Sequence, residues 1–106
     1  MIYVPECGDI VRLSSGAEIP PRPAFVISKK AFNEHTGLAL VAPVSEKIRD
    51  TQLEVALDDQ SKIAGAILVY QVKAVDFNKC EATFIEKASL TIIERVKIVL
   101  RVITID

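Results

Sequence analysis

Arg22 is the residue whose neighbours best suit it to chemistry. It stands between Pro21 and Pro23 at the start of RPAFVIS, residues 22–28. Proline fixes its own φ and favours an extended conformation at the residue before it, so the arginine leaves a rigid backbone. A planar guanidinium held in this way loses little conformational entropy when it binds an anion. We therefore expect Arg22 to bind an anion and residues 24–28 to form the strand that follows it.

Other polar residues lie where predicted strands end. Ser45 follows Pro43, which should mark the end or edge of pairing because proline has no N–H to donate. Gln71 and Lys73 are two residues apart in one predicted strand and would share a face. The remaining candidates are Glu18, Lys47 and Arg49. Spacing alone leaves open that these are turn residues or solvated strand residues.

Several classes of site are absent from the sequence. The chain has no Gly-rich phosphate loop, no Cys-x-x-Cys and no nucleophile elbow. Its one histidine, His35, falls in the predicted turn 33–37 and argues against a histidine-driven hydrolase. Cys7 and Cys80 form neither a disulfide framework nor a metal site, so we expect packing roles, no metal and no cofactor.

The composition predicts one domain over residues 1–106. Half of the residues are hydrophobic, and 13 basic against 14 acidic residues give a net charge of −1. Proteins that coat nucleic acid carry a basic excess, so this balance favours at most a compact site for a few phosphates. No apolar run approaches the ~20 residues of a membrane span. No secretory signal begins the chain, and we expect a cytoplasmic protein.

The hydrophobic pattern predicts short strands followed by one helix. Residues 14–23 are rich in serine, glycine and proline and predict a turn that excludes a central strand. From Ser89 the apolar residues recur every three or four positions, which predicts a C-terminal helix with Ser89 as its N-cap. The predicted strands are 8–13, 24–28, 38–44, 51–57, 65–77 and 82–87. The fold class is mainly β, a small barrel closed by a C-terminal helix.

These segments resemble the PemK/MazF family of bacterial toxin endoribonucleases, nearest to its ChpB-like and PemK-like members. The matching stretches are GDIV (8–11), GAE (16–18), RPAFVIS (22–28), AFNEHTG (31–37), LVAPVS (40–45), GAILVYQVK (65–73) and VDF (75–77). The resemblance implies an SH3-like barrel of five to seven strands, a homodimer, no metal, and neutralisation by a cognate antitoxin. It also implies cleavage of single-stranded RNA to leave 2′,3′-cyclic phosphate and 5′-hydroxyl ends.

The resemblance assigns roles to individual residues. Arg22 and Ser45 match the family's catalytic arginine and threonine. Glu18 matches a loop glutamate that binds RNA or orients Arg22, and Lys73 matches a basic position that contacts phosphate or supports the dimer. Gln71, Lys47 and Arg49 complete the expected RNA-binding set. An acidic antitoxin tail would occupy the groove formed by Arg22, Lys47, Arg49 and Lys73.

The chain also departs from the PemK-like pattern. Leu68 and Tyr70 stand where that branch has an arginine and an acid, and the loop after the first strand is several residues short. These departures favour two alternatives on the same barrel: a catalytically weakened or inactive protein that binds RNA or an antitoxin, or a gyrase-poisoning toxin. The C-terminal helix shows no distinctive match to the gyrase-poisoning branch.

Overall fold

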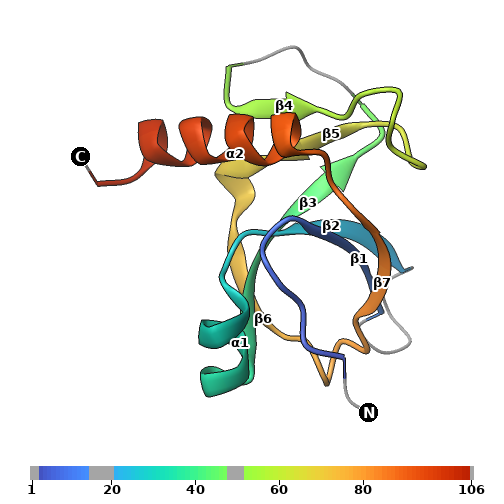
Figure 1. Cartoon of the computed structure of the whole chain (residues 1–106), viewed down its shortest axis with the longest axis vertical. Coiled ribbons are helices and arrows are strands. Elements are labelled where there is room, and N and C mark those ends of the chain that lie inside the picture. Colours follow the sequence, from blue (N-terminus) through green and yellow to red (C-terminus); the bar gives the residue numbers. More distant parts are fainter. Residues whose placement is uncertain (1–2, 15–20, 48–51, 106) are drawn as a thin grey trace.

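The computed structural model describes residues 3–14, 21–47 and 52–105. Two α-helices, one 3₁₀ turn and seven strands make up this part of the chain (Figure 1). The strands are β1 (Asp9–Leu13), β2 (Arg22–Val26), β3 (Leu38–Ser45), β4 (Glu54–Ala56), β5 (Ala66–Leu68), β6 (Lys73–Asp76) and β7 (Thr83–Lys87). The helices are α1 (Lys30–Thr36) and α2 (Leu90–Ile103), and the 3₁₀ turn is η1 (Val69–Gln71).

All the strand pairs are antiparallel, in the order β4-β5-β3-β2-β1-β7, with β6 also paired to β3. β3 changes partner along its length, because Val41 pairs with Lys73 of β6 whereas Val44 pairs with Ile67 of β5. Between these two pairs, the five residues 68–72 therefore lie opposite only two residues of β3, 42 and 43. The η1 turn takes up this excess length and stands out from the ladder as a bulge.

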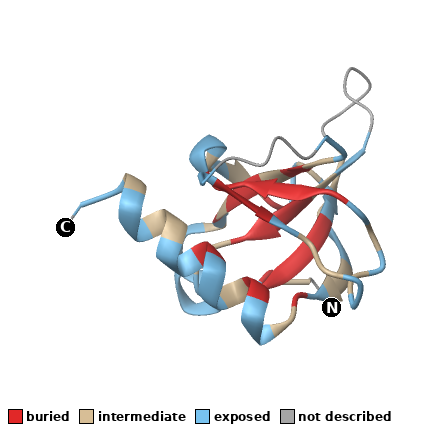
Figure 2. Cartoon of the chain, turned by 90° about the horizontal axis from the view of Figure 1, so that it is seen from above, coloured by how far each residue is buried: buried red, intermediate tan, exposed pale blue. Residues whose placement is uncertain are grey.

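Two apolar clusters occupy the two faces of the bent sheet. Ile10 and Phe25 are paired across β1 and β2 and belong to the cluster that packs under Ile92 of α2. Their neighbours Val11 and Ala24 are also paired and point to the other face, where they form the second cluster. This alternation follows from the two-residue period of a strand. Figure 2 shows the buried residues concentrated in the strands and on one side of the C-terminal helix.

The mainly β fold class with a C-terminal helix is confirmed. Ser89 is the N-cap of α2, as predicted, and its hydroxyl accepts a hydrogen bond from the Ile92 N–H at 3.3 Å. Pro43 is the last β3 residue paired with β2, as predicted, but the strand continues to Ser45 because its other edge pairs with β5 there. Among the described helices, none combines the length and the apolar character needed to cross a membrane.

Three local predictions were wrong. The predicted turn 33–37, with His35, lies largely in α1, because buried Asn33 fixes this helix through its amide, which donates to the Pro5 carbonyl at 2.7 Å. Residues 22 and 23, assigned to the turn 14–23, instead begin β2, where Arg22 pairs with Leu13; residues 15–20 of that prediction lie outside the described residues. The long strand 65–77 is instead β5, η1 and β6 in succession.

Two predicted strand bounds also need correction. The strand predicted over 51–57 is observed only as β4, and the strand predicted to end at residue 28 ends at Val26. Residues 27 and 28 instead connect β2 to α1, where the Ser28 hydroxyl donates to the Asn33 side chain at 2.5 Å. This contact explains why the chain leaves the sheet at this point.

Candidate functional site

A groove of about 180 Å³ opens on the sheet face that carries the second apolar cluster. Three polar side chains line it, from the start of β2, the end of η1 and the start of β6: Arg22, Gln71 and Lys73. Its other walls are Leu13, Pro23, Ala24, Val41, Pro43, Val75 and Cys80. The groove thus combines an apolar floor with two cations and one amide at its edge.

The cations of this groove are available for a ligand. Arg22 and Lys73 are exposed, and neither makes an ion pair with another described residue. A guanidinium offers a planar fork of donors and an ammonium offers a compact charge, so together they suit phosphoryl oxygens. The groove is therefore suited to an anion.

Ser45 lies at the same end of the sheet as Arg22. The last residues that pair β2 with β3 are Ala24 and Pro43, and Arg22 and Ser45 each lie two residues beyond that pair on the same side of it. Because side chains alternate along a strand, both residues belong to the face of Ala24 and Pro43, which line the groove. Ser45 itself is not among the groove-lining residues, and its Oγ accepts the Lys47 N–H at 3.2 Å.

Gly65 fixes the backbone at Ser45. Its φ is +135°, a conformation that favours glycine, and a Cβ built there would lie 2.3 Å from the Ser45 carbonyl oxygen. No other residue type permits this approach of β5 to β3. This role was not predicted from the sequence; the available signal was Gly65 itself, the second residue of the AGAILVY run.

The structure separates the predicted RNA-binding residues into three groups. Gln71 and Lys73 meet in the groove, although they come from η1 and β6 rather than from one strand as predicted. Lys47 is exposed after the end of β3 and does not line the groove. Glu18 and Arg49 lie outside the described residues. Cys80, which had been assigned to packing, is a groove wall, and no sequence signal indicated this.

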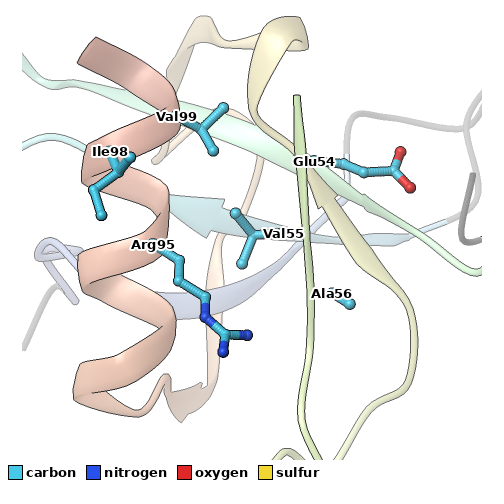
Figure 3. Close-up of a pocket in the computed structure, with 6 residues that line it drawn as sticks. All are labelled: Glu54, Val55, Ala56, Arg95, Ile98 and Val99. Atoms are coloured by element: carbon cyan, nitrogen blue, oxygen red, sulfur yellow. The ribbon is translucent and has the colours of Figure 1, made fainter. Parts of the chain in front are cut away.

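A second cavity, of about 220 Å³, lies between β4 and α2 (Figure 3). Val55, Ile98 and Val99 supply its apolar walls, and Arg95 reaches along it from the helix. The carboxylate of Glu54 points away from the helix in this view. None of the predicted site residues that the structure describes lines this cavity.

A third polar region joins the N-terminal segment to β7. The buried carboxylate of Asp9 accepts hydrogen bonds from the Tyr3 hydroxyl at 2.5 Å and the Glu6 N–H at 3.1 Å. Lys87 Nζ lies 2.8 Å from both Asp9 Oδ1 and Glu6 Oε1. We call these four residues the Asp9 clamp. Its charges are satisfied within the protein.

The clamp shifts two pKa values. Burial raises the pKa of Tyr3 most, and the hydrogen bond to Asp9 raises it further. Desolvation lowers the pKa of Lys87, but the hydrogen bonds to Asp9 and Glu6 outweigh it, so the net pKa is raised. Both shifts favour the protonated side chains that the clamp requires.

Comparison with known proteins identifies close relatives. Residues 6–104 match the family described as PemK-like, MazF-like toxin of type II toxin-antitoxin system. The endoribonuclease toxin MazF of Escherichia coli K12 is 33% identical over 86 residues, covering 76% of this chain and 77% of the relative.

Solved structures agree with this match. The crystal structure of MazE-MazF (Form-II) from Deinococcus radiodurans superposes with a TM-score of 0.85 at 29% identity, over 93% of each chain. An endoribonuclease in complex with its cognate antitoxin from a mycobacterial species has a TM-score of 0.82, at 15% identity over 92% of each chain, and supports the fold alone.

Proposed function

Because the chain belongs to the PemK-like, MazF-like toxins of type II toxin–antitoxin systems, we propose that it is an endoribonuclease that cleaves single-stranded RNA at the Arg22 groove. The observation that carries the proposal is the groove itself. Arg22 and Lys73 both line it without ion-pair partners among the described residues, and Arg22 and Ser45 each lie two residues beyond the Ala24–Pro43 pair that ends the β2–β3 ladder. The endoribonuclease names of the MazF relatives support the same activity.

The proposed reaction transfers the phosphoryl group within the RNA. The 2′-oxygen bonds to the adjacent phosphorus as its proton leaves, and the bond from phosphorus to the 5′-oxygen breaks as that oxygen takes up a proton. The products are a 2′,3′-cyclic phosphate and a 5′-hydroxyl. The need for a 2′-hydroxyl restricts the substrate to RNA.

Arg22 and Ser45 supply the donors that this reaction requires. The guanidinium binds the non-bridging oxygens, where negative charge increases as the fifth bond to phosphorus forms. The Ser45 hydroxyl already accepts the Lys47 N–H, which leaves its own O–H to donate to the phosphoryl group or the leaving oxygen. Lys73 holds a phosphate at the other edge of the groove.

The partner proposal follows from the same groove. The solved relatives include MazE-MazF complexes, so we assign this chain a cognate antitoxin as well. An acidic antitoxin segment would pair with Arg22 and Lys73 and exclude RNA by competition. We further propose that the protein is a homodimer in the cytoplasm.

One experiment tests the central claim. Purified protein is incubated with a defined single-stranded RNA in excess chelator, and the new ends are mapped. We expect cyclic phosphate and 5′-hydroxyl ends, with cleavage lost in Arg22→Ala and reduced in Ser45→Ala. Circular dichroism and thermal melting of each variant show whether its fold is retained. Intact RNA at high protein excess would contradict the proposal.

A non-catalytic binding role is the second candidate, and Leu68 and Tyr70 favour it. Leu68 is buried and carries no charge to present to RNA, and Tyr70 supplies a phenol where the PemK-like branch has a carboxylate. Binding of RNA without any cleavage by the folded wild-type protein would establish this alternative. Cleavage that depends on Arg22 would exclude it.

A further inference from the structure

Tyr70 is an exposed aromatic residue in η1, the turn that contributes Gln71 to the groove. It is the central residue of η1, it is 42% exposed, and it directly precedes the groove-lining Gln71. The preceding residue, Val69, is fully buried and anchors the turn in the core. Because η1 is the excess segment between β5 and β6, the bulge holds Tyr70 outside the ladder. A solvent-exposed aromatic ring on an anchored turn calls for an explanation.

The size of the groove limits what it holds. An apolar cavity of about 150 Å³ takes one benzene-sized molecule. At about 180 Å³, this groove accommodates one phosphate with part of its nucleoside. The neighbouring base of a bound strand must therefore lie outside it, over the surrounding surface, and part of that surface is η1, which contributes Gln71 to the groove.

The charge of the chain points to a non-ionic contribution to binding. Among the described residues, two cations line the groove, and the net charge of the chain is −1. Proteins that bind single strands add base stacking on aromatic rings to such phosphate contacts. We propose that Tyr70 is a stacking platform for the base next to the scissile phosphate, an inference that rests on the proposed function.

Binding measurements separate stacking from phosphate contact. The probe is a fluorescein-labelled single-stranded oligonucleotide with 2′-O-methyl riboses, which the proposed reaction cannot cleave, and a matched probe has abasic sites throughout. Tyr70→Ala should weaken binding of the base-containing probe between about 5-fold and 150-fold, the range for one stacked base. It should leave the abasic probe unchanged, and Tyr70→Phe should bind both probes like wild type.

Phe32 provides a matched control. It is 43% exposed, as Tyr70 is, but it belongs to α1, before the start of β3 and thus at the other end of that strand from Ser45. Phe32→Ala should bind both probes like wild type. Equal loss of affinity in Tyr70→Ala and Phe32→Ala would contradict the proposal, because general destabilisation or non-specific stickiness would then explain both.

Tyrosine fluorescence gives a second, direct readout. The chain has no tryptophan and two tyrosines, Tyr3 and Tyr70, so the Tyr3→Phe variant emits from Tyr70 alone. Stacking of a base on the ring should quench this emission when the base-containing probe binds, and the abasic probe should not quench it. Unchanged emission at saturation would overturn the stacking role.

The outcomes distinguish the two proposals. If wild-type protein cleaves RNA and Tyr70→Ala binds the base-containing probe normally, stacking is wrong and the proposed function stands. If wild-type protein neither binds nor cleaves single-stranded RNA, the proposed function fails and the stacking proposal fails with it. If Tyr70→Ala does not fold, the Tyr3→Phe quenching experiment still decides the question.

Discussion

The groove and the Asp9 clamp both contain charged side chains, but within the part of the chain that the structure describes the charges are paired in the clamp and unpaired in the groove. In the clamp, the Asp9 carboxylate accepts two hydrogen bonds and also pairs with Lys87. In the groove, Arg22 and Lys73 line one opening and have no ion-pair partner among the described residues. The clamp's charges are paired within the fold, whereas unpaired cations that line a groove are expected where a ligand supplies the counter-charge.

The comparison also shows why cavity size alone is a poor guide. The cavity between β4 and α2 is somewhat larger than the groove, about 220 Å³ against 180 Å³. It offers an arginine too, but Arg95 lies along an apolar wall of the helix, and no second cation from the part of the chain that the structure describes lines that cavity. The arrangement of donors, rather than volume, distinguishes the site.

The largest expected effect is therefore an asymmetry between two arginines. Arg22→Ala should lower the rate of RNA cleavage by about 10²- to 10³-fold, the usual effect of removing one donor from a developing oxyanion. Arg95→Ala should leave the rate unchanged. The measurement is initial cleavage rate at saturating RNA, with melting temperature as the check on folding. Equal losses in both variants would remove the distinction between the two cavities.

The next effect concerns the support of the groove rather than its charges. Gly65→Ala places a Cβ against the Ser45 carbonyl, in a backbone conformation unfavourable to alanine. We expect a loss of about 3 kcal/mol in the free energy of unfolding and a fall in cleavage rate, because the end of β3 must shift. Denaturant melts and cleavage assays measure the two effects.

Gly37 is the matched control for that variant. Its φ is +75°, but nothing lies within 4 Å of an added Cβ. Gly37→Ala should cost about 1 kcal/mol from backbone strain and leave cleavage unchanged. If the fall in cleavage rate is proportional to the loss of unfolding free energy, with the same ratio in both glycine variants, then Gly65 has no particular role at Ser45.

The sequence predicted which cations line the groove better than it predicted the secondary structure that positions them. Arg22 was identified from its flanking prolines, and Gln71 with Lys73 from their spacing. The reason given for the pair was wrong, because an inserted 3₁₀ turn, and not a shared strand, brings them to the groove. Such an insertion depends on β3 changing partner at Val44, which is a tertiary event without a local signal.

The missed helix α1 has a similar cause. Asparagine, histidine, threonine and glycine over residues 33–37 are typical of turns, and a seven-residue helix has little intrinsic stability. Asn33 is fully buried and satisfied by the Ser28 hydroxyl and the Pro5 carbonyl, so contacts from distant segments stabilise the helix. By contrast, α2 was predicted correctly because its N-cap and apolar period are both local.

A smaller effect should follow from the second cation of the groove. If Lys73 contacts one phosphate, Lys73→Ala should weaken binding of single-stranded RNA and reduce the slope of log K against log salt concentration by about 0.7. Affinities measured across a salt series test this. Lys97→Ala on α2, whose ammonium lies 3.5 Å from Glu94, should leave the slope unchanged. An unchanged slope in Lys73→Ala would assign that residue to the fold or to a subunit contact.

The smallest expected effect is a loss of folding stability at alkaline pH, where the clamp residues lose their protons. Tyr3 and Lys87 both have raised pKa values in the folded protein, so above about pH 10 the folded state binds more protons than the unfolded state. Stability contributed by these shifts is complete below that pH and falls as pH rises further. Thermal melts between pH 8 and pH 11 should show this decline, and the combined variant Tyr3→Phe with Lys87→Met should show a flatter profile from a lower starting stability.

Under conditions where this variant remains folded, its cleavage rate at neutral pH should match wild type, because the clamp shares no residue with the groove. A large loss of cleavage in the folded variant would mean that the two regions are coupled and that the separation between satisfied and available charges is wrong.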